Sequence, residues 1–231
     1  MKNIAVITAR GGSKRIPRKN IKEFCGKPII AYSIEAALAA GCFDEIMVST
    51  DDPKIAQIAE SYGAKVPFMR SAENADDFST TRDVVKEVLA QYGAQGRIFD
   101  YACCIYPTAP FITGERLKEA MGLLADKEAD SVVPVVSFSF PPQRGLVMRD
   151  GRVEFKWPEN ALVRSQDLEP FYHDCGQFYC LNTKAFAKQE LLFMKKTYPV
   201  VLDELEVQDV DNETDWKLAE LKYRLFREIA E

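Results

Sequence analysis

A positively charged stretch near the N-terminus is the first feature that could do chemistry. Residues 9–20 follow a short apolar run, residues 4–7, that is typical of a buried strand. Gly11 and Gly12 allow a tight turn and a close approach of the backbone to a ligand. The cations in this stretch are Arg10, Lys14, Arg15, Arg18 and Lys19. They repel one another unless an anion lies between them, which predicts a loop wrapped around a nucleotide triphosphate; a solvated basic loop is the alternative.

Two carboxylates near the C-terminal end are the second chemical feature. Asp209 and Asp211 flank Val210. In a strand, residues i and i+2 point the same way, so the carboxylates would share a face while Val210 packs into the core. Magnesium prefers a few carboxylates together with phosphate oxygens, so the pair fits a Mg²⁺ site. The alternative is an ordinary acidic turn that caps the last helix through Asn212 or Thr214.

Other catalytic and phosphate motifs are missing. The P-loop pattern is absent, because Gly26-Lys27-Pro28 has no glycine at the required distance and no hydroxyl after the lysine. The Gly-x-Gly-x-x-Gly pattern of dehydrogenases is absent too. His173 is the only histidine, and the six cysteines include no Cys-x-x-Cys pair, so a zinc site is not expected. A lone histidine is more often structural than catalytic.

Composition limits the class of protein. A chain of 231 residues can build one large α/β domain, or one domain with a small appendage. The net charge of −5 argues against nucleic acid as the main partner, so the basic loop suits a small phosphorylated ligand. No apolar run approaches the roughly 18 residues that span a membrane. The chain starts directly with a strand and its cysteines lie in apolar surroundings, so we expect a reduced, cytoplasmic protein without a signal peptide.

The elements that must position these residues alternate along the chain. Strands are expected over residues 4–7, 45–50, 65–68, 101–106, 131–138 and 177–181, and helices over about 27–40, 55–59, 83–92, 114–126 and 213–230. This alternation predicts parallel strands joined by right-handed crossovers, in a three-layer, doubly wound α/β fold with a mostly parallel sheet. Ligands sit beyond the carboxyl ends of such strands, which places the basic loop and the turns after residues 50 and 106 along one rim.

Residues 140–175 differ from the rest of the chain. Residues 144–155 read as a hairpin that turns at Asp150-Gly151, and an irregular segment follows. We interpret this stretch as an excursion inserted into a single domain that covers residues 1–231. Hairpins with exposed aromatic side chains often pair with another subunit, so a homodimer is expected.

The motifs together resemble a known family. Residues 9–14, followed by Ile16-Pro17 and Lys19-Asn20, resemble the CTP-binding motif of the CMP-sialic acid synthetases. Residues 49–51, the segment around Arg70, residues 107–110 and residues 209–211 match that family in order and spacing, so the resemblance covers nearly the whole chain. Within the family, the chain is most similar to the branch that uses pseudaminic acid. That similarity is carried by Arg15, Arg18 and residues 105–110, 164–170 and 172–179.

The resemblance implies a nucleotide-diphospho-sugar transferase-like fold and a cytidylyltransferase reaction. In it, the anomeric hydroxyl of a nonulosonic acid attacks the α-phosphate of CTP and releases pyrophosphate. Positioning and charge neutralisation do most of this work. The implied catalytic residues are Arg10, Lys14, Lys19 and Asp211. The implied CTP-binding residues are Arg10, Gly11, Gly12, Ser13, Lys14, Lys19, Asn20, Arg70 and Thr81. Mg²⁺ would be held by Asp209 and Asp211.

The sugar side is implied less directly. Its expected residues are Tyr106, Thr108, Arg144, Arg164, Gln177 and Tyr179. Arg144 and Arg164 are both candidates for the sugar carboxylate, because a guanidinium fork suits that group. Many sialic acid synthetases have glutamine where this chain has Tyr106, and arginine where it has Phe111-Ile112. These departures favour a less polar or 6-deoxy sugar such as pseudaminic acid over N-acetylneuraminate. CMP-N-acetylneuraminate and CMP-3-deoxy-octulosonate synthetases are the alternatives. A nucleotide-sensing module with the same fold is the non-enzyme alternative.

Overall fold

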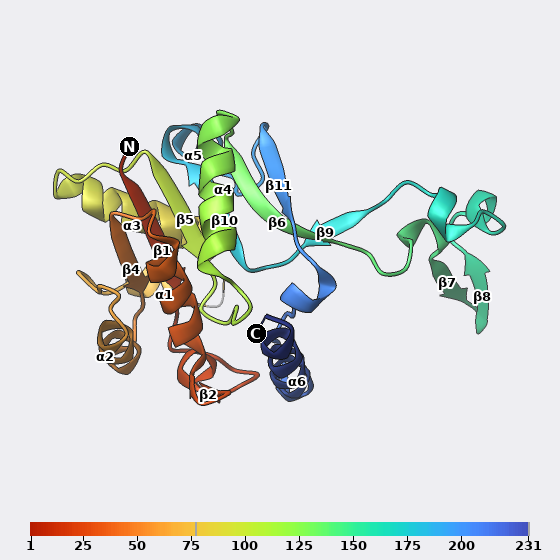
Figure 1. Cartoon of the computed structure of the whole chain (residues 1–231), viewed down its shortest axis with the longest axis horizontal. Helices are drawn as coiled ribbons and strands as arrows, with labels where there is room; N and C mark the ends of the chain where they lie inside the picture. Colours follow the sequence, from red (N-terminus) through yellow and green to blue (C-terminus); the bar gives the residue numbers. More distant parts are fainter. Residues whose placement is uncertain (77, 231) are drawn as a thin grey trace.

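The computed structural model describes residues 1–76 and 78–230, and a mixed sheet runs through its centre (Figure 1). The strand order is β11-β6-β10-β5-β1-β4, and β9 pairs with β6 off this path. The strands of the path are β1 (Asn3–Thr8), β4 (Glu45–Ser49), β5 (Tyr101–Ile105), β6 (Ser131–Ser137), β10 (Phe178–Asn182) and β11 (Thr197–Val201). All of these run in one direction except β10, which is antiparallel to both neighbours.

Helices cover both faces of the sheet. They are α1 (Ile29–Ala40), α2 (Pro53–Ser61), α3 (Thr81–Ala94), α4 (Gly114–Asp126), α5 (Thr183–Gln189) and α6 (Glu213–Ala230). Along β1, Ala5 and Ile7 pack with α1, α2 and α4, whereas Ile4 and Val6 pack with α3. This two-residue alternation divides the core between the two faces. The prediction of a three-layer α/β fold with a mostly parallel sheet is therefore confirmed.

Local sequence signals set the ends of the helices. Gly41 ends α1 in the left-handed conformation, with φ of 62°. Asp52 caps α2 by accepting the backbone N–H groups of Lys54 and Ile55. Thr80 and Asp83 form a reciprocal capping box at the start of α3. The helix predicted from residue 27 starts at Ile29 instead, because residues 27–28 form a short strand.

The strand predicted over residues 65–68 forms only one bridge, between Met47 and Lys65. Lys65 donates its backbone N–H to Ile46 and accepts one from Val48. Pro67 follows and has no N–H to continue the ladder, so the pairing stops there. This part of the strand prediction was wrong.

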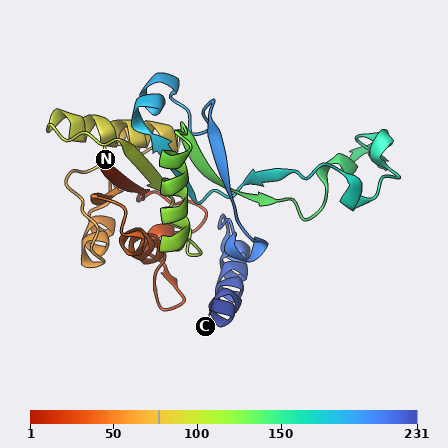
Figure 2. The same cartoon turned by 45° about the horizontal axis from the view of Figure 1, so that its top comes forward.

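An arm formed by residues 138–171 leaves the sheet between β6 and β9 (Tyr172–Asp174) (Figures 1 and 2). Its tip carries the hairpin of β7 (Leu146–Arg149) and β8 (Arg152–Phe155). Asp150 and Gly151 both have positive φ, 51° and 74°, as a tight hairpin turn requires. The predicted hairpin and its turn are confirmed.

Smaller elements complete the chain. A two-stranded ribbon joins β2 (Glu23–Phe24) and β3 (Lys27–Pro28). Short 3₁₀ turns occur at Lys19–Ile21, Ala72–Asn74, Pro142–Arg144, Pro158–Asn160, Ser165–Asp167 and Glu204–Glu206. None of the helices described is long and apolar enough to cross a lipid bilayer.

Candidate functional site

The carboxyl ends of β1, β4, β5, β6 and β11 meet at one edge of the sheet, because these strands run in the same direction. Ile7 pairs with both Val48 and Ile105, which aligns the ends of the central strands. Two adjoining pockets lie at this edge. The basic pocket is a cavity of about 510 Å³. Among its lining residues are Arg10, Ser13, Lys14, Arg15, Lys19, Asn20, Arg70, Thr81, Tyr106, Thr108 and Asp211.

The second cavity, of about 590 Å³, has mixed chemistry, and we call it the acceptor pocket. It is lined by Tyr106, Val136, Ser137, Phe138, Ser139, His173, Asp174, Cys175, Gly176, Tyr179, Glu204, Val207, Gln208, Asp209 and Lys222. Tyr106 is the residue that lines both pockets. The predicted rim of the sheet is therefore a double cavity with a shared wall.

A hydrophobic cluster joins the basic loop to the acidic segment, although 190 residues of chain separate them. Ile16 from the loop and Val210 from the segment are both fully buried in this cluster, together with Phe24 and Trp216. Lys19 also donates from Nζ to the Val210 carbonyl at 2.8 Å. Burial of these apolar side chains contributes about 1.5–3 kcal/mol each. The cluster thus positions the cations and the carboxylates of the site against one another.

Four of the five loop cations line the basic pocket, and Arg18 does not. Arg18 adopts the left-handed conformation, with φ of 53°, and its guanidinium pairs with Asp52 at 3.0 Å. Arg15 pairs with Asp211 at 2.8 Å across the pocket. Burial lowers the pKa of Lys19, and the carboxylates of Asp211 and Asp209 oppose that shift. An anionic ligand in this pocket would meet a dense positive field.

Gly11 lies against the turn after β4. Its backbone N–H donates to Asp51 Oδ1 at 2.8 Å, and a Cβ added there would lie 3.0 Å from the Cβ of Asp52. The backbone N–H of Ser13 donates to the carbonyl of Gly11 at 3.1 Å. The N–H groups of Gly11 and Ser13 are therefore satisfied within the protein, and a phosphate would have to displace these acceptors.

Two buried polar residues hold backbone at the edge of the basic pocket, Asn20 within the loop and Arg70 at the end of β4. Asn20 donates from Nδ2 to the Arg10 carbonyl at 2.8 Å. The guanidinium of Arg70 donates from Nη2 to the Ser49 carbonyl at 2.6 Å and from Nε to Ser49 Oγ at 3.0 Å. Burial lowers the pKa of Arg70, and Asp51 opposes the shift. Both residues still line the pocket, so each can contact a ligand while it holds the backbone.

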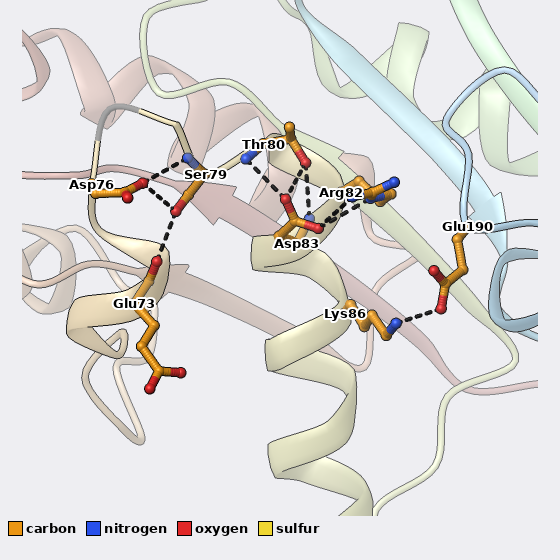
Figure 3. A network of polar contacts seen from close by, with 8 residues as sticks. All are labelled: Glu73, Asp76, Ser79, Thr80, Arg82, Asp83, Lys86 and Glu190. Carbon is orange, nitrogen blue, oxygen red and sulfur yellow. Dashed lines mark hydrogen bonds and ion pairs between the residues drawn. The ribbon is translucent and has the colours of Figure 1, made fainter.

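The loop before α3 is held by its own polar network (Figure 3). The carboxylate of Asp76 accepts from the backbone N–H of Ser79. The Ser79 hydroxyl lies within hydrogen-bond distance of both this carboxylate and the Glu73 carbonyl, and its single proton serves one of them at a time. Lys86 lies further along α3 and forms an ion pair with Glu190, which ends α5. Arg10 donates to the Asp76 carbonyl at 2.9 Å, which connects this loop to the basic loop. The network fixes the start of α3, where Thr81 faces the pocket.

Polar and aromatic contacts also connect the two pockets. The hydroxyls of Tyr106 and Thr81 lie 3.1 Å apart. The Tyr106 ring lies 5.7 Å from the ring of Tyr179, whose hydroxyl donates to Asp174 Oδ2 at 2.6 Å. Burial raises the pKa of Tyr106 and that of Tyr179, so both phenols stay protonated. The shared wall therefore combines polar contacts on each side with a ring contact between Tyr106 and Tyr179.

The acidic segment differs from the prediction. Residues 207–212 form no strand, because β11 ends at Val201 and a capped 3₁₀ turn at Glu204–Glu206 intervenes. Val210 is buried, as predicted. Asp209, however, lines the acceptor pocket, whereas Asp211 lines the basic pocket. The carboxylates therefore flank the junction and do not share a strand face. Asn212 caps α6, as the alternative interpretation predicted.

The donor set at this junction suits a hard cation that brings other ligands with it. In residues 1–76 and 78–230, no group of three or more His, Cys, Asp or Glu side chains could hold a metal. Asp209 and Asp211 together supply two carboxylates, both accessible from a pocket. Magnesium is commonly held by one or two carboxylates plus phosphate oxygens and water. The residues present fit Mg²⁺ that arrives with a nucleotide.

Only some of the residues predicted to bind the sugar lie at the acceptor pocket. Tyr106 and Tyr179 line the acceptor pocket. Gln177 is buried and donates to the Glu206 carbonyl at 2.6 Å, so it holds the chain that leads to the acidic segment. Arg144 and Arg164 lie on the arm, outside both pockets of their own chain.

Both arginines donate hydrogen bonds to other residues of the arm. Arg144 donates to the Ser165 hydroxyl, and Arg164 donates to the Asp167 carboxylate. Sequence reasoning missed Lys222 as a pocket residue. It lies on α6, and only the position of that helix in the fold brings it to the acceptor pocket.

Comparisons with known proteins place these pockets in context. Residues 4–201 match the model of a family described as cytidylyltransferase. The chain is 38% identical over 231 residues to the pseudaminic acid cytidylyltransferase of Campylobacter jejuni, and the match covers all of both chains. It is 35% identical over 237 residues to the CMP-N,N'-diacetyllegionaminic acid synthase of Legionella pneumophila, covering 99% of each.

Among solved structures, CMP:2-keto-3-deoxy-manno-octonic acid synthetase complexed with CTP matches with a TM-score of 0.69. The match covers 99% of this chain and 100% of that one, at 20% identity. At this level of identity the match shows a common fold.

Proposed function

Because this chain belongs to the cytidylyltransferase family, we propose that it transfers CMP from CTP to the anomeric hydroxyl of a nonulosonic acid, most specifically pseudaminic acid. The observation that carries the proposal is the double cavity. A pocket rich in cations adjoins a pocket of mixed polarity, and Tyr106 forms the wall between them. A triphosphate in the first and a sugar in the second would meet at that wall, beside Asp209 and Asp211.

In the proposed reaction, the anomeric oxygen forms a bond to the α-phosphorus of CTP, and the bond from that phosphorus to the β-phosphate bridge breaks. Pyrophosphate leaves with the bonding electrons, and the hydroxyl proton is released. Arg10, Lys14 and Lys19 would neutralise the charge that accumulates on the phosphates. Removing one such donor from a developing oxyanion typically costs about 3–4 kcal/mol in the barrier.

The remaining residues of the basic pocket would bind the nucleotide without taking part in bond changes. Asn20, Arg70 and Thr81 would contact the nucleoside, and backbone N–H groups of the glycine turn would contact the phosphates. Asp209 and Asp211 would hold Mg²⁺, which supplies charge neutralisation at the phosphates and makes the attacking hydroxyl more acidic.

Pseudaminic acid is the proposed sugar because of similarity along the whole chain and because of Tyr106 at the sugar-facing wall. Full-length identity to the pseudaminic acid enzyme exceeds that to the legionaminic acid enzyme by only three percentage points, 38% against 35%. N-acetylneuraminate and 3-deoxy-octulosonate are the competing acceptors. We also propose a homodimer formed through the arm.

The test is pyrophosphate release from CTP and magnesium, measured in parallel with pseudaminic acid, N,N'-diacetyllegionaminic acid, N-acetylneuraminate and 3-deoxy-octulosonate. We expect the highest kcat/KM with pseudaminic acid. A preference for another sugar would replace the named substrate. Titration calorimetry with CTP, with and without magnesium, separates the remaining alternative: CTP binding without pyrophosphate release on the whole panel indicates a nucleotide sensor.

A further inference from the structure

A cation of α6 faces the acceptor pocket. Lys222 lines this cavity beside Val207, Gln208 and Asp209, and among the residues described it is the only lysine or arginine to do so. The other charged or titratable side chains of the lining are His173, Asp174, Glu204 and Asp209, together with the neutral Tyr106, Cys175 and Tyr179. A ligand that carries a carboxylate would meet mostly negative charge in this cavity, except at Lys222. The carboxylate of such a ligand would therefore be most favourably placed beside Lys222.

The ammonium group of Lys222 is only partly used by the protein. Nζ donates to the Val207 carbonyl at 2.6 Å. A lysine ammonium has three N–H donors, so two remain. The side chain of Lys222 is half-buried, which keeps its stem in place. Burial lowers the pKa of Lys222, and Glu204 and Asp203 oppose the shift.

The chemistry of a 2-keto acid sugar explains why a cation at the position of Lys222 would affect the reaction. In a 2-keto acid sugar, the carbon that bears the attacking hydroxyl is bonded directly to the carboxylate carbon. A cation that holds the carboxylate therefore also sets the direction of the hydroxyl. Lys222 and Asp209 line the same cavity, and Asp209 lies at the junction where the phosphates would enter. The alternative arginines, Arg144 and Arg164, belong to the arm of residues 138–171 and line neither pocket of their own chain.

We propose that Lys222 binds the carboxylate of the acceptor sugar and thereby orients its anomeric hydroxyl toward the basic pocket. This role rests on the proposed function. It makes Lys222 a determinant of specificity for acid sugars over their neutral analogues. Its contact with Val207 also connects sugar binding to the backbone that precedes Asp209.

The experiment combines a change in the protein with a change in the substrate. Lys222→Met is compared with the wild type on the preferred acid sugar and on its C1 carboxamide, which lacks the negative charge. A charge-assisted hydrogen bond of this kind is worth about ten- to hundred-fold in kcat/KM. We expect Lys222→Met to lose that factor on the acid, mainly through the KM of the sugar, and to change less than about threefold on the carboxamide. The KM of CTP should stay constant.

Matched variants separate charge recognition from structure. Lys222→Arg should recover most of the activity on the acid, and Lys222→Gln should behave like Lys222→Met while retaining a donor for Val207. Lys217→Met, an exposed lysine on the same helix, is the control and should match the wild type. Thermal melting and CTP binding show whether each variant is folded.

Three results would overturn the inference. One is an equal loss on acid and carboxamide, which indicates a structural role through Val207. Another is an unchanged sugar KM in Lys222→Met, and a third is a loss confined to Arg144→Met, which moves carboxylate binding to the arm. Failure of the proposed function looks different, because the wild type itself would then release no pyrophosphate with any acid sugar, and the inference would fall with it.

Discussion

Asp211 occupies a position where an ion pair and a metal would compete. Its carboxylate pairs with Arg15 at 2.8 Å, and its side chain is 41% exposed. An exposed pair contributes only about 0–1 kcal/mol to stability. Asp211→Ala should therefore lower kcat by at least about 100-fold through loss of the metal, with little change in the unfolding free energy. Steady-state kinetics across a magnesium titration and a urea melt measure both quantities.

The control for this variant is Glu213→Ala, which removes an exposed carboxylate two residues further along and breaks only an ion pair with Lys22. It should keep wild-type activity. Wild-type turnover in Asp211→Ala would remove magnesium from our assignment of this residue.

The glycine pair of the basic loop makes a second prediction, because the two positions differ in the space around them. A Cβ at Gly11 would lie 3.0 Å from Asp52 Cβ, whereas a Cβ at Gly12 meets nothing within 4 Å. Gly11→Ala should displace the loop from the turn after β4 and weaken CTP binding by about tenfold or more, since real Cβ atoms avoid such contacts. Gly12→Ala should leave the loop in place and bind CTP more tightly than Gly11→Ala does. Calorimetric titration with CTP compares them, and equal affinities would contradict the prediction.

For single residues, the sequence predicted which side chains belong to the site better than it predicted which residues they contact. The loop cations, Asn20 and Arg70 were predicted as a group, and the structure places all of them except Arg18 around one pocket. That Arg18 pairs with Asp52 instead depends on its left-handed backbone, which no side-chain pattern reveals. Lys222 was missed because a single lysine on an amphipathic helix has no distinguishing spacing. Only packing brings it to the cavity.

The buried carboxylate of Glu45 joins β4 to α3 and to the segments that follow α2 and α3. We expect this carboxylate to control how stable the fold is in acid. Glu45 opens β4 and accepts hydrogen bonds from Tyr92, Arg97 and Lys65. Burial alone would raise the pKa of Glu45, but these hydrogen bonds outweigh it and hold the pKa below its ordinary value of 4.5. The unfolded state therefore binds the proton more readily, and this contribution to stability is complete above about pH 4.5 and lost as pH falls through the folded pKa.

Glu45→Gln tests this origin of the acid sensitivity. At pH 7 it should cost about 1–3 kcal/mol of unfolding free energy, because charge-assisted hydrogen bonds are lost. Below pH 4.5 the difference from the wild type should shrink, since the wild-type carboxyl becomes protonated too. Urea denaturation at several pH values measures it. A cost that stays constant from pH 7 to pH 3.5 would show that the charge of Glu45 is not the cause.

Elements with strong local signals were predictable, and those set by distant contacts were not. Gly41 and the Thr80 capping box mark helix ends in the sequence itself. By contrast, residues 207–212 show an i, i+2 pattern that fits a strand, but their conformation is set by the capped turn before them and by Val210 in the cluster with Ile16. The pattern predicted which residue is buried and could not predict that the two carboxylates face different cavities.

The whole molecule has an exposed apolar arm that its own core does not cover. Leu162 is 97% exposed, and Met148 and Val153, which pair across β7 and β8, are 75% and 64% exposed. Figures 1 and 2 both show the arm projecting from the sheet. The sequence predicted this excursion through its hairpin and its change of composition. Its direction is set where β6 and β9 leave the sheet together, which a local pattern does not specify.

A second copy of the chain is the proposed cover for this arm, and a charge on the arm should remove it. Val153→Glu places a carboxylate opposite Met148 in a face that would be desolvated on association, so the dimer should weaken by about 30-fold or more. Light scattering after size-exclusion chromatography, over a range of concentrations, should give the mass of two chains for the wild type and of one for Val153→Glu. Arg152→Ser, a neighbouring exposed polar change, should remain dimeric. A wild type that is monomeric at micromolar concentration would reject the homodimer, and a dimeric Val153→Glu would move the interface off this hairpin.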